Sequence, residues 1–294
     1  MAEIINLDRN LVEGFKPVRP EDGHKNTFGQ ALICAGSEYM TGAAVMACGA
    51  ALRSGAGLVK VFSEEKTLNA ISINEPCALL ELRPDNTALL IRTSKKLCEK
   101  ASSVLIGSGI PADYKNMEAL TGVFLESSLN VVLDAGALTG KPDVLARLTE
   151  RLKMRKTPAV ITPHIGEFAR MLRITTNEVS DRAEELASGF ALKNNVVVVL
   201  KGSRTLIATP DGKIYVNDLP NSGLAKGGSG DVLAGLITGF LAQGMEPYKA
   251  AVSAVYIHSK TGEIAAQETG ARYMIPEDLI IYLPEGYQEA GWRD

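Results

Sequence analysis

The sequence predicts an α/β fold of three layers, in which helices cover both faces of a mostly parallel central sheet. Three observations indicate this fold. Short apolar runs alternate with longer segments of helical periodicity, as they do in βαβ units. The apolar runs show no alternation of polar and apolar residues, which is typical of strands buried on both faces. One pair of runs is instead joined by Pro210-Asp211-Gly212, a turn that predicts an antiparallel hairpin.

The expected elements follow from these patterns in chain order. We expect strands at 31–35, 58–62, 104–106, 131–133, 159–161 and 196–200, and hairpin strands at 205–208 and 213–216. A helix rich in Ala and Gly is expected at 41–53. Two closing helices are expected at about 231–243 and 247–267, the first because its apolar residues recur at helical spacing.

Composition bounds the domain count and the partners. We expect one domain over residues 1–294, because no repeat, low-complexity linker or change of composition divides the chain. The net charge of -3 offers no basic surface for nucleic acid or an anionic membrane. No segment approaches the roughly 18 uninterrupted apolar residues of a membrane helix, and the N-terminus does not read as a signal peptide. The four cysteines form no Cys-x-x-Cys pair, so we expect a reducing, cytoplasmic setting.

Small or polar residues follow the ends of five predicted strands. They are Gly36-Ser37, Gly107-Ser108-Gly109, Asp134-Ala135-Gly136, Thr162-Pro163-His164 and Lys201-Gly202-Ser203. Each loop alone reads as a turn. Ligands of open α/β sheets bind beyond the carboxyl ends of the strands, so the five loops together predict a site at one edge of the sheet.

The run Gly227-Gly228-Ser229-Gly230-Asp231 is the most informative motif. A glycine-rich turn that leads into a helix leaves backbone N–H groups free to bind phosphate. A carboxylate beside that site would repel phosphate, unless it binds a metal or takes a proton from a hydroxyl that attacks phosphorus. The alternative is that Asp231 only caps the helix.

Other nucleotide-binding motifs are absent from the sequence. It contains no P-loop, no Gly-x-Gly-x-x-Gly after the first strand, and no Gly-x-Ser-x-Gly elbow with a suitable histidine. What remains is a site made by the glycine turn and the segment from Lys201 to Thr205. In isolation, Lys201 and Arg204 read as surface charges; beside the turn they become candidates to contact a nucleotide.

Three further features each have two interpretations. Glu167, in the run Thr162-Pro163-His164-Ile165-Gly166-Glu167, is either a first-turn helix acid or a carboxylate that holds Mg²⁺ through water. The small residues of 36–44 allow tight helix–sheet packing, or the close approach of a planar ligand. Asp134 is either a turn former or a contact for ligand hydroxyls.

Together these residues resemble the ADP/ATP-dependent NAD(P)H-hydrate dehydratases of the ribokinase-like superfamily. The similarity covers nearly the whole chain. The motifs that carry it are His24-Lys25 with Gly29, Gly36-Ser37 through Gly42-Ala43-Ala44, Arg53 to Val59, Gly107-Ser108-Gly109, Leu133-Asp134-Ala135, Thr162 to Glu167, Lys201-Gly202 and Gly227 to Gly235. The last of these indicates only the superfamily. The Thr-Pro-His-x-Gly-Glu and Gly-Ser-x-x-x-x-Gly-Ala-Ala runs indicate the dehydratases.

The resemblance implies a ribokinase-like fold and an enzyme that removes water from the S form of hydrated NADH or NADPH, with ADP favoured over ATP. It implies a base at Asp231, and Gly228 and Gly230 N–H groups that stabilise the transferring phosphoryl group. The implied hydrate site comprises Ala43, Gly107, Gly109, His164 and Asp231. The implied nucleotide site comprises Lys201, Gly202, Ser203, Arg204, Thr205 and Gly230. Mg²⁺, held by Glu167 through water, and a homotetramer are also implied.

Two departures and two alternatives remain. Asn26 stands where the family has glycine, and Ser108 where it commonly has proline, so the shapes of both loops are open. The epimerase domain often fused to the family is not expected here.

A vitamin-precursor kinase such as hydroxyethylthiazole kinase shares the glycine–aspartate turn and would release a stable phosphorylated product. A catalytically silent nucleotide sensor is disfavoured by the intact Asp231.

Overall fold

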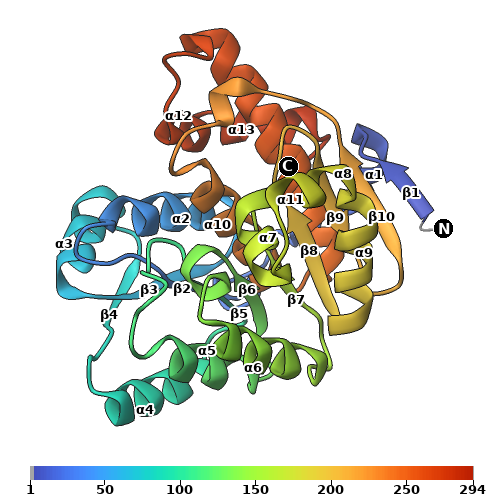
Figure 1. The fold of residues 1–294 in the computed structure, drawn as a ribbon. Coiled ribbons are helices and arrows are strands. Elements are labelled where there is room, and N and C mark those ends of the chain that lie inside the picture. Colours follow the sequence, from blue (N-terminus) through green and yellow to red (C-terminus); the bar gives the residue numbers. More distant parts are fainter. Residues whose placement is uncertain (1–2, 294) are drawn as a thin grey trace.

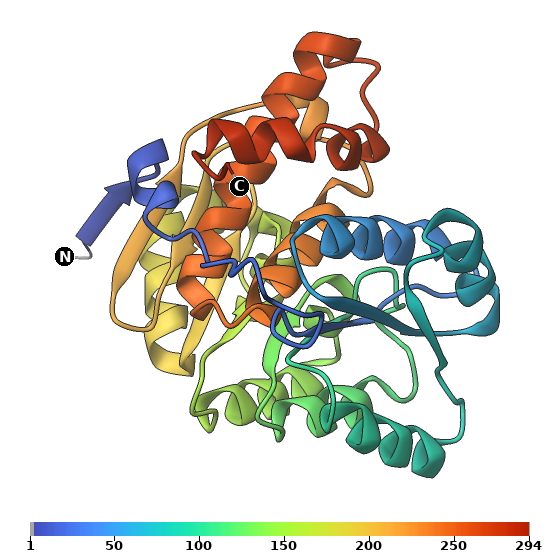
Figure 2. The same cartoon turned by 180° about the vertical axis from the view of Figure 1, so that it is seen from behind.

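A single sheet organises the chain in the computed structural model, which describes residues 3–293 (Figures 1 and 2). Residues 1, 2 and 294, which the single-domain prediction includes, lie outside the described residues. Ten strands within 3–293 pair in the order β1-β10-β9-β8-β7-β6-β5-β2-β3-β4. Their bounds are β1 Glu3–Asn6, β2 Gln30–Cys34, β3 Leu58–Ser63, β4 Leu79–Leu82, β5 Ser103–Ile106, β6 Asn130–Leu133, β7 Ala159–Ile161, β8 Val196–Leu200, β9 Thr205–Ala208 and β10 Lys213–Asn217.

The sheet is parallel except at β9. This strand pairs antiparallel with β8 on one side and with β10 on the other, while β1 pairs parallel with β10. The predicted hairpin across Pro210-Asp211-Gly212 is therefore confirmed. Strands β2, β5, β6, β7 and β8 are consecutive parallel neighbours, so their carboxyl ends lie along one edge of the sheet.

Helices cover both faces of the sheet (Figure 1). Their bounds are α1 Arg9–Glu13, α2 Thr41–Arg53, α3 Glu65–Asn74, α4 Thr87–Cys98, α5 Met117–Leu125, α6 Pro142–Lys153, α7 Ile165–Leu172, α8 Thr176–Asp181, α9 Ala183–Asn194, α10 Ser229–Ala242, α11 Pro247–Ala265, α12 Pro276–Ile281 and α13 Leu283–Glu289. One face carries α2, α3 and α10–α13, and the other carries α4–α9.

Two separate cores explain why the strands lack polar alternation. In β2, Ala31 and Ile33 pack into the core beneath α2 and α10, whereas Leu32 and Cys34 pack into the core on the opposite face. Because successive strand residues point to opposite faces, both sets must be apolar. The predicted three-layer arrangement is therefore confirmed.

The differences from expectation lie in the less apolar parts of the chain. The two edge strands, β1 and β4, were not expected; both are short and mostly exposed, so neither shows a buried apolar run. Helix α10 begins at Ser229, two residues before the predicted start. The expectation of two closing helices is incomplete, because α12 and α13 follow α11. Within residues 3–293, no helix is both long and apolar enough to cross a bilayer.

Candidate functional site

Asp134 is the centre of the site at the carboxyl edge of the sheet. Its side chain is buried directly after β6, and both of its oxygens accept hydrogen bonds. Ser108 Oγ donates to Oδ2 at 2.8 Å, while Thr162 Oγ1 and Lys201 Nζ donate to Oδ1 at 2.7 and 3.0 Å. Asp134 therefore joins the loops that follow β5, β6, β7 and β8. Its backbone oxygen also accepts from Ala137 N–H at 3.0 Å, as a turn former does, and its contact with ligand hydroxyls stays a prediction.

The charges around Asp134 fix its ionisation. Burial alone would raise the pKa of the Asp134 carboxyl, but the Lys201 charge and the hydrogen bonds from Thr162, Lys201 and Ser108 hold that pKa below its usual value. Burial alone would lower the pKa of Lys201, but the carboxylates of Asp134, Glu167 and Asp231 raise it above its usual value. Asp134 and Lys201 are therefore an ion pair at neutral pH.

Lys201 is thus part of the interior of the site. Its side chain is 21% exposed, and the interpretation of Lys201 as a surface charge is wrong. An added Cβ on Gly230 would lie 3.2 Å from Lys201 Nζ, so the ammonium group sits directly against the first turn of α10. The Lys201 N–H also donates to Pro163 O at 2.9 Å, which ties the loop after β8 to the loop after β7.

Asp231 lies in the first turn of α10, with its carboxyl next to this pair. The N-cap of the helix is Gly228, at φ 106, and Asp231 is the third residue of the helix. The interpretation of Asp231 as a cap is therefore wrong. Burial and the nearby charge of Asp134 raise the pKa of Asp231 to about 7, against the opposing effects of Ser108 and Lys201. A carboxyl with this pKa is suited to accept a proton near neutral pH.

His164 and Glu167 cap helix α7 reciprocally. Gly166 N–H and Glu167 N–H donate to His164 Nδ1 at 3.0 and 3.2 Å, and His164 N–H donates to Glu167 Oε2 at 2.9 Å. Since Nδ1 accepts, the ring proton resides on Nε2, which lies 3.5 Å from Glu167 Oε1. This is a capping box with histidine in the place of serine or threonine.

The capping box places the two side chains differently. The His164 side chain is 53% exposed, whereas that of Glu167 is 8% exposed. Glu167 is a first-turn helix acid, as one of its two interpretations required, and one of its oxygens already accepts a backbone hydrogen bond. Within residues 3–293, no group of three or more His, Cys, Asp or Glu side chains is arranged to hold a metal ion.

Gly109 and Ala43 bring the loop after β5 against the start of α2. An added Cβ on Gly109, which has φ 65, would lie 2.6 Å from Ala43 Cβ and 2.9 Å from Met40 O. Gly107, at φ 118, allows the backbone of the loop after β6 to come close, because a Cβ on Gly107 would lie 1.9 Å from Asp134 O. The small residues of this region therefore do allow tight packing, the first of their two interpretations.

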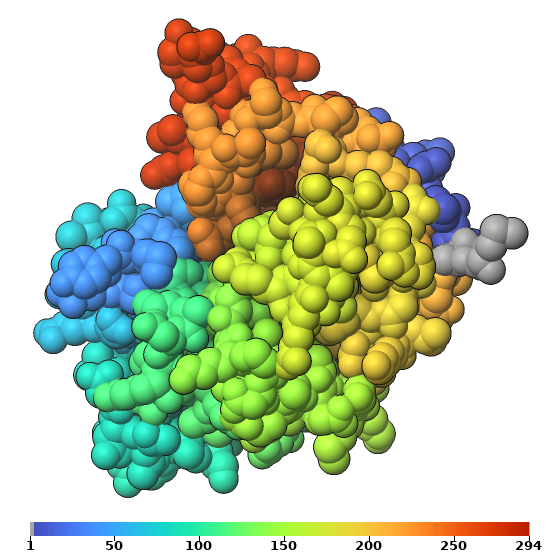
Figure 3. Space-filling model, in the orientation of Figure 1, coloured from blue at the N-terminus to red at the C-terminus, as the bar shows by residue number. Residues whose placement is uncertain are grey.

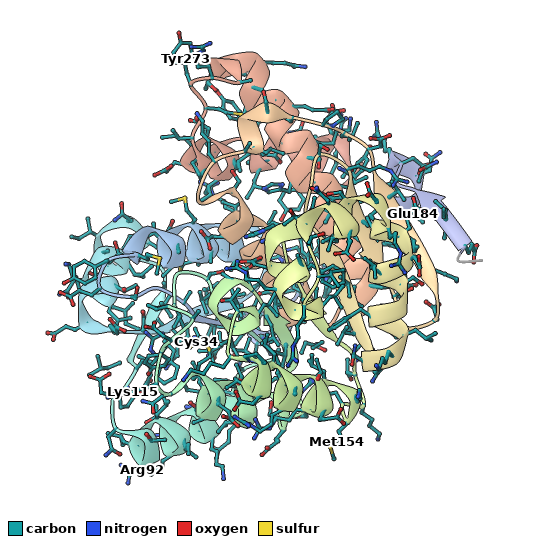
Figure 4. All side chains as sticks on the ribbon, in the orientation of Figure 1. Cys34, Arg92, Lys115, Met154, Glu184 and Tyr273 are labelled. Atoms are coloured by element: carbon teal, nitrogen blue, oxygen red, sulfur yellow. The ribbon has the colours of Figure 1, made fainter. Side chains whose placement is uncertain are left out.

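A cavity of about 510 Å³ opens beside Lys201 and the start of α10. Figure 3 shows this face hollowed between the segment after β10, in orange, and the yellow region of α7 to α9. Four of the predicted nucleotide residues line the cavity from the β8–β9 loop, and Gly230 lines it from α10; those four are Lys201, Gly202, Ser203 and Thr205. Arg204 does not line it and forms an ion pair of 2.8 Å with Glu184, which Figure 4 labels.

Other residues of this cavity were missed from the sequence. They come from the end of β10, the loop after it, and α11: Asn217, Leu219, Asn221, Leu224, Val255, His258 and Ser259. Burial lowers the pKa of His258 to about 4, so the ring is neutral, and its Nε2 lies 3.0 Å from Ser229 O. The run Leu219-Pro220-Asn221-Ser222-Gly223 is a turn signal that marks a loop, but it does not indicate a ligand.

Comparisons with known proteins show the family of this chain. A family model described as NAD(P)H-hydrate dehydratase matches residues 31–285. A curated ADP-dependent (S)-NAD(P)H-hydrate dehydratase of Bacillus subtilis is 35% identical over 268 residues, which are 91% of this chain and 92% of that protein. The chain spans about half the length of curated bifunctional NAD(P)H-hydrate repair enzymes that it also matches.

Solved structures give the same result for the fold. The Bacillus subtilis ADP/ATP-dependent NAD(P)H-hydrate dehydratase, co-crystallised with ATP/Mg²⁺, superposes with a TM-score of 0.84 at 32% identity, over 97% of this chain and 98% of that chain. A ribokinase-like superfamily protein of Enterococcus faecalis V583 has a TM-score of 0.81 at 25% identity, over 99% of this chain and 97% of that chain. The ribokinase-like fold expected from the sequence is therefore confirmed.

Proposed function

This chain belongs to the NAD(P)H-hydrate dehydratase family, and from that premise we propose that residues 1–294 form one domain that dehydrates (S)-NADH hydrate or (S)-NADPH hydrate at the expense of ADP, or of ATP. The observation that carries the proposal is the Asp231 carboxyl. It has a pKa of about 7 and lies at the start of α10, beside the Lys201–Asp134 ion pair and at the edge of a cavity lined by Lys201 and Gly230.

The chemical problem is a poor leaving group. Hydroxide leaves C6 of the hydrated nicotinamide ring with difficulty, whereas phosphate leaves readily. In the proposed reaction, Asp231 accepts the proton of the C6 hydroxyl as its oxygen attacks the terminal phosphorus of the nucleotide. The ring nitrogen then donates its electron pair, the bond from C6 to the phosphate oxygen breaks, and loss of a proton from C5 restores the reduced nicotinamide. The nucleotide leaves one phosphate shorter.

Backbone groups stabilise the transferring phosphoryl group. The Ser229 and Asp231 N–H groups donate to Lys226 O and Gly228 O, whereas those of Gly228 and Gly230 have no hydrogen-bond partner among residues 3–293. Free N–H groups at the start of α10, together with the positive end of its dipole, favour an anion there. The Lys201 ammonium, against the same turn, adds positive charge.

We assign the two ligands to two sides of Asp231. Lys201, Gly202, Ser203, Thr205 and Gly230 bind the nucleotide, since all five line the cavity of about 510 Å³. Arg204 is assigned to the nucleotide with them, on the far side of the same β8–β9 loop. Ala43, in the first turn of α2, is assigned to the hydrate together with Gly107, Gly109 and His164, because these residues follow β2, β5 and β7 along the same edge.

Magnesium fits this site as a hydrated ion. Mg²⁺ usually keeps several waters and needs one or two carboxylates plus substrate phosphates. Glu167 has one oxygen that accepts from His164 N–H, and its charge acts on Lys201, which lies against Gly230. Glu167 would hold the ion through water, and a bound ion would neutralise charge on the nucleotide phosphates.

The assembly and setting are part of the same proposal. We assign a cytoplasmic homotetramer that binds neither nucleic acid nor membrane, in keeping with the net charge of -3 and the unpaired cysteines. Sedimentation equilibrium at micromolar chain concentration tests the tetramer. A monomer or dimer there would contradict that assignment.

A coupled assay tests the activity. Purified chain, (S)-NADH hydrate, Mg²⁺ and either ADP or ATP should restore absorbance at 340 nm, faster with ADP, and release AMP and inorganic phosphate from ADP. The R hydrate is the matched control and should not react. Absence of recovery with both nucleotides, together with phosphorylation of an alcohol such as hydroxyethylthiazole, would establish the alternative of a vitamin-precursor kinase.

A further inference from the structure

A second cavity lies at the opposite edge of the molecule. It has a volume of about 560 Å³ and is bordered by the segment after α1, the C-terminal ends of α2 and α10, helix α13 and the residues that follow it. Figure 2 shows the segment between α1 and β2 running across the back of the molecule, near α13 and the C-terminal end of the chain. None of its lining residues belongs to the site around Asp231.

The cavity is strongly basic. Lys16, Arg19, Arg53 and Arg293 line it, and no Asp or Glu among residues 3–293 does so. This is a local concentration of positive charge in a chain whose net charge is -3. The helix C-termini nearby add a partial negative charge of about 0.5 each for α2 and α10, which leaves the cavity positive.

Three of the four cations interact with neighbouring groups in different ways, and Arg293 contributes its backbone oxygen to one of these contacts. Arg19 donates to Gly55 O at 2.9 Å and stacks over the Phe28 ring at 3.9 Å. Lys16 donates to Arg293 O, which links the two chain segments across the cavity. Arg53 is exposed in the last turn of α2 and lies near Glu75. Burial raises the pKa of Glu75, and the charge of Arg53 opposes that rise. Arg53 and Arg293 are therefore the cations whose substitution disturbs the fold least.

One wall of the cavity is aromatic. The rings of Tyr287 and Trp292 stack at 5.9 Å with an interplanar angle of 27°, and Trp292 is fixed by a hydrogen bond of 2.9 Å from Nε1 to Val12 O. The side chains of Gln243 and Gln288 also line the cavity, and Gln243 is held by Ser54 O and Gly239 O. Cations beside a fixed aromatic wall suit a phosphate ester that carries a planar ring.

We propose that this cavity is a second nucleotide site, which binds the phosphates of a nucleoside phosphate through Arg53 and Arg293 and its base against the Tyr287–Trp292 wall. The proposal does not depend on the activity of the Asp231 site. The cavity is large enough for a mononucleotide, and its charge selects the phosphorylated form over the free nucleoside.

Equilibrium dialysis with radiolabelled ADP tests the proposal on the intact chain. The wild-type chain should bind two ADP molecules per chain at saturation. Arg53→Glu and Arg293→Glu, and the milder Arg53→Gln, should retain one ADP per chain and the wild-type KM for ADP. Arg92→Glu is the matched control, because Arg92 is an exposed arginine on α4, on the other face of the sheet (Figure 4), and should leave two.

Competition defines the ligand. AMP should displace the second ADP at least tenfold more effectively than inorganic phosphate, and adenosine should not displace it. One ADP per wild-type chain would overturn the proposal, as would two that persist in both charge-reversal variants. Equal competition by inorganic phosphate and AMP would overturn the role of the aromatic wall, and displacement by adenosine would overturn the role of the cations.

Discussion

Lys201 and Asp134 form a buried ion pair of 3.0 Å, and the ammonium group of that pair lies directly against Gly230 in the first turn of α10. One contact therefore connects the loop after β6, the loop after β8 and the helix that carries Asp231. The same lysine thus pairs with Asp134, lies against the turn that carries the proposed base and lines the cavity of about 510 Å³.

Breaking this pair should destabilise the fold. Lys201→Met leaves Asp134 buried without its counter-ion, and we expect a loss of about 3–5 kcal/mol in the free energy of unfolding, measured by urea denaturation. Asp134→Asn/Lys201→Met, which removes both charges, should be more stable than Lys201→Met alone. Equal losses in the single and double variants would show that an unpaired Asp134 carboxylate carries no penalty, which would contradict this prediction.

Replacing Asp231 should abolish turnover without abolishing nucleotide binding. Asp231→Asn should lower kcat at least ~100-fold, because the proton acceptor is lost, and should leave the Kd for ADP within about threefold of the wild type. In the wild type, kcat/KM should fall as the pH drops below about 7, since the carboxyl must be ionised to act. A variant with near-normal turnover would reduce Asp231 to a structural residue.

The same carboxyl should make stability depend on pH. Its pKa is raised from 3.8 to about 7 in the fold, so the folded state binds more protons than the unfolded state between these values. Its contribution to the free energy of unfolding is therefore present below pH 3.8 and lost as the pH rises through about 7. Relative to the wild type, the urea midpoint of Asp231→Asn should therefore be higher at pH 8 than at pH 5. The same difference between the two proteins at both pH values would contradict this.

His164 should show two separable roles. His164→Ala removes the cap of α7 and should cost about 1 kcal/mol in unfolding free energy, and it should raise the KM for the hydrate more than the KM for ADP. His164→Asn is the matched control, because asparagine can cap the helix without the imidazole. It should restore stability but not the KM for the hydrate. An equal change in both KM values would count against the placement of His164 in the hydrate site.

Gly107 should be intolerant of a side chain. Gly107→Ala adds a Cβ 1.9 Å from Asp134 O at φ 118, whereas Gly244→Ala adds one at φ 86 with no atom within 4 Å. Both variants carry the backbone strain of a left-handed residue, on the order of 1–2 kcal/mol, so their difference isolates the displacement of Asp134. Gly107→Ala should have the lower Tm and the lower kcat; identical effects would contradict this.

The buried strands of the sheet could be predicted from the sequence, but its two edge strands could not. Buried strands such as β7 and β8 show their apolar runs directly, whereas the edge strands β1 and β4 are short and mostly exposed, and β1 pairs with β10, which is distant in sequence. The five strand-end loops could be placed on one edge because parallel neighbours share an edge.

The roles of individual polar residues could not be predicted. The capping box of His164 uses a histidine where the usual signal is serine or threonine. The coordination of Asp134 by Ser108, Thr162 and Lys201 joins residues up to 67 positions apart, and no local pattern records it. His258 and Asn217 line the cavity of about 510 Å³ from the interior of α11 and the end of β10, where the sequence shows only an ordinary helix and strand.

Helices α2 and α10 pack closely against each other at two glycines of α10. An added Cβ on Gly235 would lie 2.2 Å from Ala47 O, and one on Gly239 would lie 1.9 Å from Ser54 Oγ. This close packing opposes sliding of one helix along the other, and Ala43 and Asp231 lie in the first turns of the two helices. Helices α2 and α10 therefore form one fixed side of the proposed site. A cross-link between α2 and α10 should therefore leave the catalytic cycle intact.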